Sequence, residues 1–454
     1  MRLKYRWLVI VCLLSSLSLS AIAQNGWKAG TAKINITPKE NMWMAGFASR
    51  TRPSEGAMHD LWLKALALED QNGYRSLLIT GDIIGFFKNI SDDIRDQIAA
   101  KHGLSRAQII LNSSHTHSGP VLDNASLDII YPVSEAERNK IMTYTASFKG
   151  EVIALAEMAF RNLEPVTLYS GNGVTRFQVN RRNNDVSTLT KVSELKGPQD
   201  YAVPVIKIAS SDNQLKAIVF GYACHPTVLN GYEWSGDYPG FTQIALEKQY
   251  PGAMAMFFQG AGGDQNALPR NTVPLAKQYG LQLAASVTRV LEEDMKILSP
   301  VLTTSYNEVD LLFAKSPDKN ELKKMADTNS GYLKVWAEHM LKKVEAGATF
   351  PTTYPYPVQA WKLGDQALLS LGGELTIEYS IKLKKILGPE TFIMGYSNDV
   401  MSYIPSLTIL KEGGYEGNTS QMAFGLHTTW DSSIESRIIE TAIKTAQQAG
   451  ISVP

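Results

Sequence analysis

The sequence predicts an α/β fold. Short apolar runs of strand length alternate along the chain with longer segments that carry helix-start and helix-end signals. No internal repeat, low-complexity tract or proline- and serine-rich linker marks a domain boundary. The alternation indicates an α/β or α+β architecture, and the length allows one large domain or two modest ones.

The predicted strands are brief, rich in Ile, Val, Leu and Phe, and bounded by glycine or polar clusters, as buried strands are. They cover residues 76–80, 108–111, 203–208, 217–222, 254–258, 367–371 and 392–394. Two helices have clear ends. Ser91 as N-cap and Gly103 after the last turn enclose residues 92–102. Ser134 and Glu137 form a capping-box pattern that starts a second helix, which we expect to run to about Asn162.

The first residues predict a secretory signal peptide over residues 1–23. Residues 1–6 carry three basic side chains, an apolar run follows, and Ala21-Ile22-Ala23 forms a small-x-small cleavage signal. A signal anchor is the alternative, but the apolar core is short and no stop-transfer pattern follows it. We therefore expect an exported protein, periplasmic or secreted, whose mature domain spans residues 24–454.

Composition narrows the class of protein further. The 44 basic and 44 acidic side chains balance, so no general basic field favours nucleic acid as a partner. After cleavage Cys224 is the one remaining cysteine, which excludes an internal disulfide framework. No second apolar stretch approaches membrane-spanning length, so we expect no transmembrane segment in the mature chain. The oligomeric state stays open.

Polar clusters follow five of the apolar runs. Ligands of open α/β sheets bind at the carboxyl ends of the strands, so a shared site is the economical interpretation. The clusters are Thr80-Gly81-Asp82, residues 112–118, Cys224-His225-Pro226, residues 260–266 and Gly372-Gly373-Glu374.

Three of the seven histidines belong to these clusters. His115 and His117 are spaced i, i+2, which on extended backbone places both imidazoles on one face; a polar loop that caps backbone groups is the alternative. His225 follows a strand, and Glu374 follows two glycines at a strand-to-helix turn, where it could also simply complement a helix dipole. Imidazoles with one carboxylate are the usual ligands of a catalytic zinc ion. The remaining histidines, which we interpret as surface or structural, are His59, His102, His339 and His427.

The glycine-rich stretch at residues 260–266 is neither a P-loop nor a dinucleotide fingerprint, because it lacks the Lys-Ser/Thr ending and the required spacing. Its backbone amides and Asn266 could bind an oxyanion or a leaving group. Cys224 is a weak nucleophile candidate, because adjacent residues on extended backbone face opposite ways and His225 would point elsewhere.

Taken in order, the motifs of this chain resemble those of the neutral ceramidase amidohydrolases, over nearly the whole mature length. The matching segments are Ile36-Thr37-Pro38, Met44-Ala45-Gly46-Phe47, residues 114–120, Ala223-Cys224-His225-Pro226, Ser235-Gly236-Asp237, Gly263-Asp264, Gly373-Glu374, Asn398 with Tyr403, and Tyr415-Glu416-Gly417. The resemblance implies a single large catalytic domain with mixed sheets flanked by helices.

The resemblance also implies a zinc site and a set of catalytic residues. Its ligands would be His115, His225, Glu374 and Tyr403. His117 would orient the reacting water or act as general acid/base, and Tyr415 would donate to the developing oxyanion. Asp264 and Asn266 fall in the family's catalytic glycine-rich segment, and Asn180-Arg181 resembles another pocket segment. The implied activity is hydrolysis of the N-acyl bond of ceramide or a related N-acyl lipid through zinc-activated water.

Two departures from the family bear on the substrate. Asn266 stands where the family has a serine, so an acyl-enzyme at this position is excluded. The chain also stops too soon after Tyr415 for the family's trailing immunoglobulin-like domain. A zinc hydrolase of an ester or a glycan-derived carbohydrate substrate is therefore the alternative, and a non-catalytic metal- or lipid-binding protein is a third. Residues 42–44 and Phe47 could line an acyl entrance, although core packing is the better interpretation.

Overall fold

The computed structural model describes residues 26–184 and 194–453. The predicted signal peptide lies outside these ranges. In the part of the chain that the structure describes, no helix is long and apolar enough to cross a membrane.

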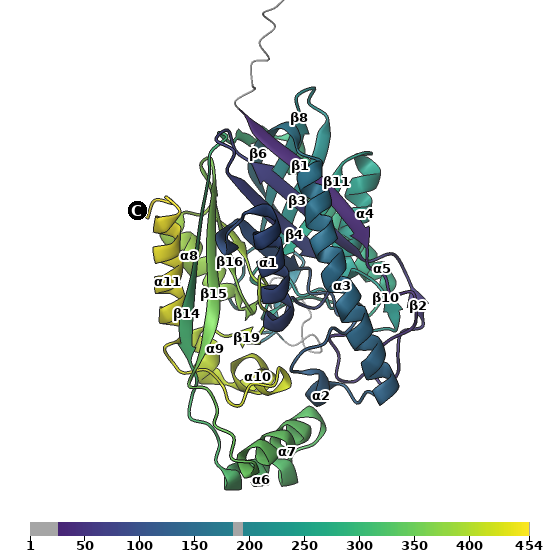
Figure 1. Ribbon diagram of the computed structural model, residues 1–454, viewed down its shortest axis with the longest axis vertical. Coiled ribbons are helices and arrows are strands. Elements are labelled where there is room, and N and C mark those ends of the chain that lie inside the picture. The colour runs from purple at the N-terminus through teal and green to yellow at the C-terminus, as the bar shows by residue number, and fades with distance from the viewer. Residues whose placement is uncertain (1–25, 185–193, 454) are drawn as a thin grey trace, which may run out of the picture.

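The protein is built in four layers, with two β-sheets packed face to face between two layers of helices (Figure 1). The larger sheet has nine strands, eight of them in the order β11-β9-β8-β6-β1-β3-β4-β5, with β13 (Lys296–Ile297) paired to β6. The pairs β4–β5 and β9–β11 are parallel, and the other neighbours on this path are antiparallel. Along the chain these strands are β1 (Trp27–Asn35), β3 (Trp62–Glu69), β4 (Arg75–Gly81), β5 (Ile109–Ser113), β6 (Glu164–Val174), β8 (Ala202–Ser210), β9 (Leu215–Tyr222) and β11 (Met254–Gln259).

The smaller sheet has four strands in the order β14-β15-β16-β18 and is also mixed, because only β16 and β18 run parallel. Its strands are β14 (Leu302–Leu312), β15 (Thr353–Leu363), β16 (Gln366–Leu371) and β18 (Phe392–Met394). The flanking helices are α1 (Lys88–His102), α3 (Glu135–Arg161), α4 (Asp237–Gln249) and α5 (Val273–Glu292) on the larger sheet, and α8 (Ile377–Leu387) and α11 (Ile434–Gln448) on the smaller one.

Both faces of most strands are buried, which explains their nearly continuous apolar sequences. One core fills the space between the sheets, where Leu168 and Phe258 of the larger sheet join Trp361 and Leu368 of the smaller one. A second core lies under α1 and α3, a third under α4 and α5, and a fourth under α8 and α11. The prediction of an α/β fold with mixed sheets flanked by helices is confirmed.

The seven predicted strands all occur, and the two predicted helices occur with one error. Ser134 accepts a hydrogen bond from Glu137 N and starts α3, as predicted. Gly103 ends α1 in a left-handed conformation, with φ of 64°. The predicted N-cap was wrong, because Ser91 lies inside the helix. The first turn of α1 is capped instead by Asp399, which accepts a hydrogen bond from the backbone of Lys88.

The two edges of the larger sheet approach each other, so strand ends far apart in the sheet order meet at one place. Asn112 bridges them: its Oδ1 accepts from Gln259 N at 2.9 Å and its Nδ2 donates to Gly395 O at 2.8 Å. The carboxyl ends of β5, β11 and β18 are thereby joined. This closure is what brings the polar clusters that follow these strands together.

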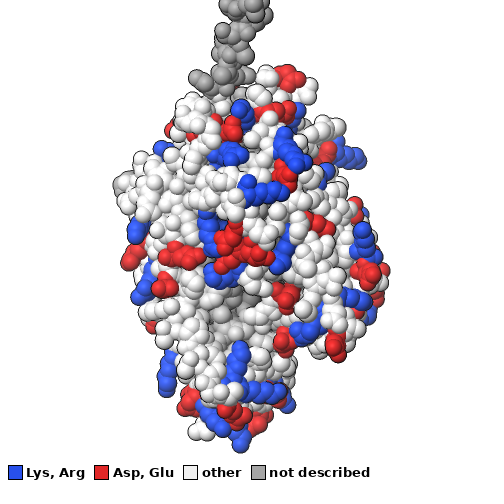
Figure 2. Space-filling view, in the orientation of Figure 1, with Lys and Arg blue, Asp and Glu red and all other residues white. Residues whose placement is uncertain are grey.

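A helical hairpin of α6 (Lys319–Thr328) and α7 (Gly331–Glu345) projects from this end of the molecule (Figure 1). Trp336 of α7 packs with Ile129 of α2 (Leu127–Ile130) and Met422 of α10 (Ser420–Ala423). Acidic and basic side chains interleave over the visible face of the protein, with no large region of one sign (Figure 2).

Candidate metal centre

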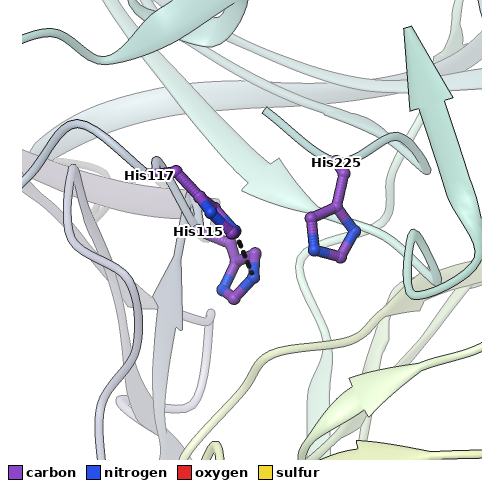
Figure 3. Close-up of side chains that lie close together, drawn as sticks. All are labelled: His115, His117 and His225. Carbon is purple, nitrogen blue, oxygen red and sulfur yellow. Dashed lines mark hydrogen bonds between the residues drawn. The ribbon is translucent and has the colours of Figure 1, made fainter. Parts of the chain in front are cut away.

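The loop after β5 carries the first histidine, and its backbone is bent rather than extended. His115 has a left-handed backbone, with φ of 62°, which is unusual for a residue other than glycine. Its backbone N donates to Ile83 O, and its Nδ1 lies 2.6 Å from Ile84 O. The extended-strand explanation for the pairing with His117 was therefore wrong. The convergence it predicted still occurs, because the turn brings the two Nε2 atoms to 3.3 Å (Figure 3).

The second histidine is held in the same manner on the loop after β9. His225 Nδ1 lies 2.8 Å from Gly262 O, and His225 N donates to Gln265 O. A parallel β-bridge also places His225 opposite Asn266. Because carbonyl oxygens can only accept, Nδ1 carries the proton in the neutral rings of His115 and His225. Their Nε2 lone pairs therefore face the space between them.

Glu374 and Tyr403 enter this space from two very short parallel strands. β17 (Glu374–Leu375) pairs with β19 (Tyr403–Ile404), and Glu374 and Tyr403 are direct partners in the ladder. Glu374 Oε2 lies 3.2 Å from His115 Nε2 and 3.1 Å from His225 Nε2. The Tyr403 hydroxyl lies 3.2 Å from His225 Nε2. The structure thus brings together the four residues predicted as metal ligands.

The spacing and chemistry of these atoms fit a tetrahedral cation. Ligand atoms about 2.0 Å from a tetrahedral zinc ion are separated from one another by about 3.3 Å, close to the distances seen here. Within the described residues, Glu374 Oε2 is buried without a hydrogen-bond donor directed at it. A carboxylate oxygen facing two imidazole lone pairs is unfavourable unless a cation lies between them. Imidazole and carboxylate donors suit zinc.

His117 offers a further nitrogen to the same space. His115, His117 and His225 each place one ring nitrogen within 4.8 Å of the others, so the three together could also hold a metal ion (Figure 3). His117 differs from the other two in its ring environment, since its Nδ1 has no hydrogen-bond partner among the described residues. Metal-ligating histidines usually donate their second ring N–H to an acceptor. This difference favours Glu374 over His117 as a ligand beside His115 and His225.

The protonation states also suit a cation site. Burial lowers the pKa of His225 to about 4, so its ring is neutral near pH 7. Burial disfavours the charged form of Glu374, but the positive charge and N–H groups of His115 and His225 in their protonated form outweigh burial and hold the pKa of this carboxyl well below its usual range, so a positive charge between the three groups stabilises the carboxylate. Burial, with the nearby His115 and His225, lowers the pKa of His117 well below its usual value. A metal ion bound here would supply that positive charge while the His225 and His117 rings stay neutral.

Arg181, which follows β7 (Gln178–Asn180), connects the ligand shell to its surroundings. Its guanidinium donates to the Tyr403 hydroxyl at 3.0 Å, to Asn266 Oδ1 at 3.3 Å and to Glu416 Oε1 at 2.7 Å. Only the family resemblance indicated this residue beforehand, since a single arginine after a three-residue strand carries no periodic signal. Tyr396 also lies at the site and was not predicted. The centroids of the Tyr396 and His115 rings are 4.5 Å apart.

Three polar residues of the strand-end clusters do not face the metal space. Asp264, predicted to be catalytic, has both carboxylate oxygens engaged, by Ile377 N of α8 and by Asn180 Nδ2. Asp82 accepts from Trp62 N, and its segment contributes only backbone carbonyls to the His115 loop. Cys224 is buried, and burial raises the pKa of its thiol well above the usual value, which argues against a cysteine nucleophile.

A cavity of about 50 Å³ opens onto these residues. His115, His117, Glu374 and Tyr403 lie in its wall, and Tyr415, 45 % exposed, also lines it. The rest of the wall is mostly apolar and is formed by Ala45, Gly46, Ile84, Phe87, Val121, Leu122, Asn124, Ser126, Ile130, Tyr131, Ala423 and Phe424. Met42, Trp43 and Met44 are buried in the core instead of lining this cavity, as the packing interpretation predicted.

The fold and the converging side chains thus define an α/β protein with a buried site of metal-ligand type. The model of the neutral/alkaline non-lysosomal ceramidase N-terminal domain matches residues 27–266. The chain belongs to this family, which is one of hydrolases.

Two solved structures have the same fold. The chain is similar to the neutral ceramidase from Pseudomonas aeruginosa, with 18% sequence identity and a TM-score of 0.73, over 94% of this chain and 75% of that one. It is similar to a ceramidase complexed with C2, with 17% identity and a TM-score of 0.72, over 94% of this chain and 76% of that one. The predicted family and fold are therefore confirmed.

Proposed function

We propose that this chain is a zinc-dependent amidohydrolase that cleaves the N-acyl bond of ceramide or a related N-acyl lipid. The observation that carries the proposal is the position of Glu374 Oε2, which lies 3.2 Å from His115 Nε2 and 3.1 Å from His225 Nε2 and is buried with no described residue donating a hydrogen bond to it. With Tyr403 they would hold the ion. When bound there, zinc would polarise an acyl carbonyl and lower the pKa of a water molecule toward neutrality.

His117 supplies the proton transfers in this proposal. Its Nε2 faces the metal space, and the lowered pKa leaves the ring neutral at rest and makes it a strong proton donor once it has taken up a proton. It would take a proton from the attacking water as the C–O bond forms. It would then return that proton to the leaving nitrogen as the C–N bond breaks, releasing an amine and a carboxylic acid, which keeps the second proton of the water until it ionises.

Arg181, Asn266 and Tyr415 surround the reacting carbonyl in this proposal. The Asn266 oxygen accepts from Arg181, which leaves the amide N–H groups of Asn266 to donate. Tyr415 lies beside Tyr403, with ring centroids 5.3 Å apart, and would donate to the developing oxyanion from the cavity wall. No residue at position 266 needs to act as a nucleophile, since water attacks directly.

The apolar cavity wall favours an acyl-chain substrate over a sugar. Phe87, Val121, Leu122, Ile130 and Phe424 give the cavity few hydrogen-bonding groups for carbohydrate hydroxyls. An ester of a similar lipid would fit the same cavity wall. Hydrolysis rates measured on matched amide and ester substrates distinguish the two activities. We also propose that residues 1–23 direct export and that residues 24–454 form the mature hydrolase domain, as the N-terminal sequence pattern suggests.

The proposal is tested by fatty-acid release from a short-chain ceramide in bile-salt micelles, with zinc-loaded mature protein and His115→Ala as the control. Release by the parent protein alone supports the proposal. Full activity of His115→Ala would exclude the metal assignment. Hydrolysis of esters or N-acetyl sugars with no release from ceramide would move the substrate to the alternative class.

A further inference from the structure

The ring of His117 is held by contacts of a different kind from those that hold the two other histidines of the site. His115 and His225 are each fixed by an Nδ1 contact to a backbone carbonyl, whereas no described residue pairs with His117 Nδ1. Packing holds the ring instead. A Cβ atom at Gly46 would lie 2.4 Å from His117 Cγ, and the Phe47 ring lies 4.9 Å away between centroids. The orientation of His117 therefore depends on where the loop that carries Gly46 and Phe47 lies.

Arg50 ties this loop to the His117 backbone. Its side chain is buried, with the residue 3 % exposed. One nitrogen, Nη1, donates both to Ala45 O at 2.5 Å and to His117 O at 2.7 Å. Nε and Nη2 both donate to Gly231 O, at 3.2 and 3.0 Å. A single guanidinium thus joins three separate loops at their carbonyl groups.

This arrangement is unusual for a buried arginine, because its partners are neutral. No carboxylate of a described residue lies within ion-pair distance of Arg50 in the part of the chain that the structure covers. Burial lowers the pKa of Arg50 to about 10, so the side chain remains charged near pH 7. A buried charge without a counter-ion is costly, and only a planar fork of donors can reach all three carbonyls at once.

We propose that Arg50 is a positioning residue for His117, which it holds by fixing the His117 carbonyl and the Ala45–Phe47 loop against which the ring packs. The inference rests on the proposed function where it assigns His117 the proton transfers. Among the described residues, the Arg50 guanidinium donates to the three loop carbonyls and to none of the four predicted metal ligands. If Arg50 acts by positioning His117, its effect on hydrolysis should depend on the presence of the His117 ring, and a double-mutant cycle measures that dependence.

A double-mutant cycle tests this coupling. Arg50→Met, which keeps side-chain bulk and removes the donors, should lower kcat for ceramide hydrolysis by about ten- to a hundredfold, with KM and bound zinc nearly unchanged. In a His117→Ala background the same substitution should lower kcat less than about twofold further. Equal losses in both backgrounds would overturn the proposal. Arg52→Met is the matched control, since Arg52 is exposed and pairs with Glu55 on the surface, and its kcat should stay within about twofold of the parent.

A structural readout keeps the inference separate from the proposed function. Selective ¹³C labelling of histidine rings follows His117 by NMR in protein without substrate, with His117→Ala assigning its signal. Arg50→Met, or Arg50→Lys if the first variant does not fold, should shift or broaden the His117 signal and leave those of His115 and His225 in place. An unmoved His117 signal would overturn the proposal even in an active enzyme. If the His117 signal moves in a protein that does not cleave ceramide, the positioning role of Arg50 is supported and the proposed substrate is wrong.

Discussion

Glu374 and Tyr403 face each other as direct partners in a two-residue parallel ladder, and this pairing places a carboxylate and a phenol on the same side of the candidate metal space. The ladder depends on the turn before it. Gly373 has φ of 69°, donates its N–H to Asp399 O and lies against the partner strand. The position of the carboxylate is therefore set by backbone geometry as well as by its own side chain.

Replacing the carboxylate should remove most of the metal affinity. Glu374→Gln keeps the shape of the side chain and removes the charge between His115 and His225. We expect zinc affinity to fall at least about a hundredfold and hydrolysis to fall with it. Competition with a chromogenic chelator measures the affinity. Glu440→Gln, on the exposed face of α11, is the control, and zinc binding equal to the parent in Glu374→Gln would contradict the assignment.

Gly373→Ala should disturb the site without touching a ligand. A Cβ at this position would lie 2.4 Å from the Ile404 side chain and 2.8 Å from Ser402 O, in addition to the strain of a positive φ. We expect lower zinc affinity and a free energy of unfolding reduced by more than the ~1–2 kcal/mol that left-handed backbone alone costs.

The matched control for this change is Gly347→Ala. Gly347 also has positive φ, 77°, but has no atom within 4 Å of its Cβ position. Gly347→Ala should lower the free energy of unfolding only by the cost of the left-handed backbone, and zinc affinity should be unchanged. If the two alanine variants lose equal stability in urea titrations and both keep zinc, the packing argument for the Glu374 turn is wrong.

Glu416 should make the stability of the protein pH-dependent. Burial disfavours its charged form, but Arg181 and Arg182 outweigh burial and lower the pKa of this carboxyl, with both ion pairs at 2.7 Å. A carboxyl with a lowered folded-state pKa stabilises the protein fully above its unfolded pKa of about 4.3, and the contribution is lost as pH falls through the folded value.

Glu416→Gln should therefore reduce the free energy of unfolding by about 2–4 kcal/mol at pH 7, and the difference from the parent should shrink below about pH 4.3. Urea unfolding between about pH 2.5 and pH 7 measures it, because this range includes the pH values below the unfolded pKa. Glu412→Gln, which removes a half-exposed partner of Arg182, should cost less than about 1 kcal/mol. A difference that stays constant as the pH falls would contradict the ion-pair account.

Asn266→Ala should lower kcat by about ten- to a hundredfold while zinc binding is retained, because the amide lies beside the site without being a ligand. Steady-state kinetics and metal analysis measure the two effects. Mass spectrometry of the parent protein quenched during turnover should show no acyl adduct on the chain. A covalent acyl intermediate would show that another residue acts as nucleophile and that direct attack by water is wrong.

The strands and the residues of the candidate metal site could be predicted because each leaves a local pattern in the sequence. Strands such as β9 and β11 are buried on both faces, so they appear as continuous apolar runs. The histidines and Glu374 follow such runs, and the order of the motifs matched a known family. What could not be predicted depends on contacts between distant segments. Asn112 connects the two edges of the sheet, and the carboxylates of Asp399 and Asp264 accept hydrogen bonds from the first backbone N–H groups of helices that are far away in sequence.

The dependence on features outside the local sequence also explains the two wrong predictions, the N-cap of α1 and the extended backbone at His115. Ser91 has the local features of an N-cap, but the capping carboxylate comes from Asp399, so α1 can begin a turn earlier. The i, i+2 histidines converge through the left-handed turn at His115, which no propensity indicates for histidine after a strand. Arg50 and Arg181 carry no pattern of their own, because their importance lies in carbonyl and side-chain partners from several loops.

The most direct measurement is an anomalous difference map from crystals of the zinc-loaded protein, collected on both sides of the zinc absorption edge. The account predicts one strong peak about 2.0–2.2 Å from His115 Nε2, His225 Nε2 and a Glu374 carboxylate oxygen, with the Tyr403 hydroxyl beside it. A peak bound by the three histidines with Glu374 outside the coordination sphere, or a peak elsewhere, would contradict it.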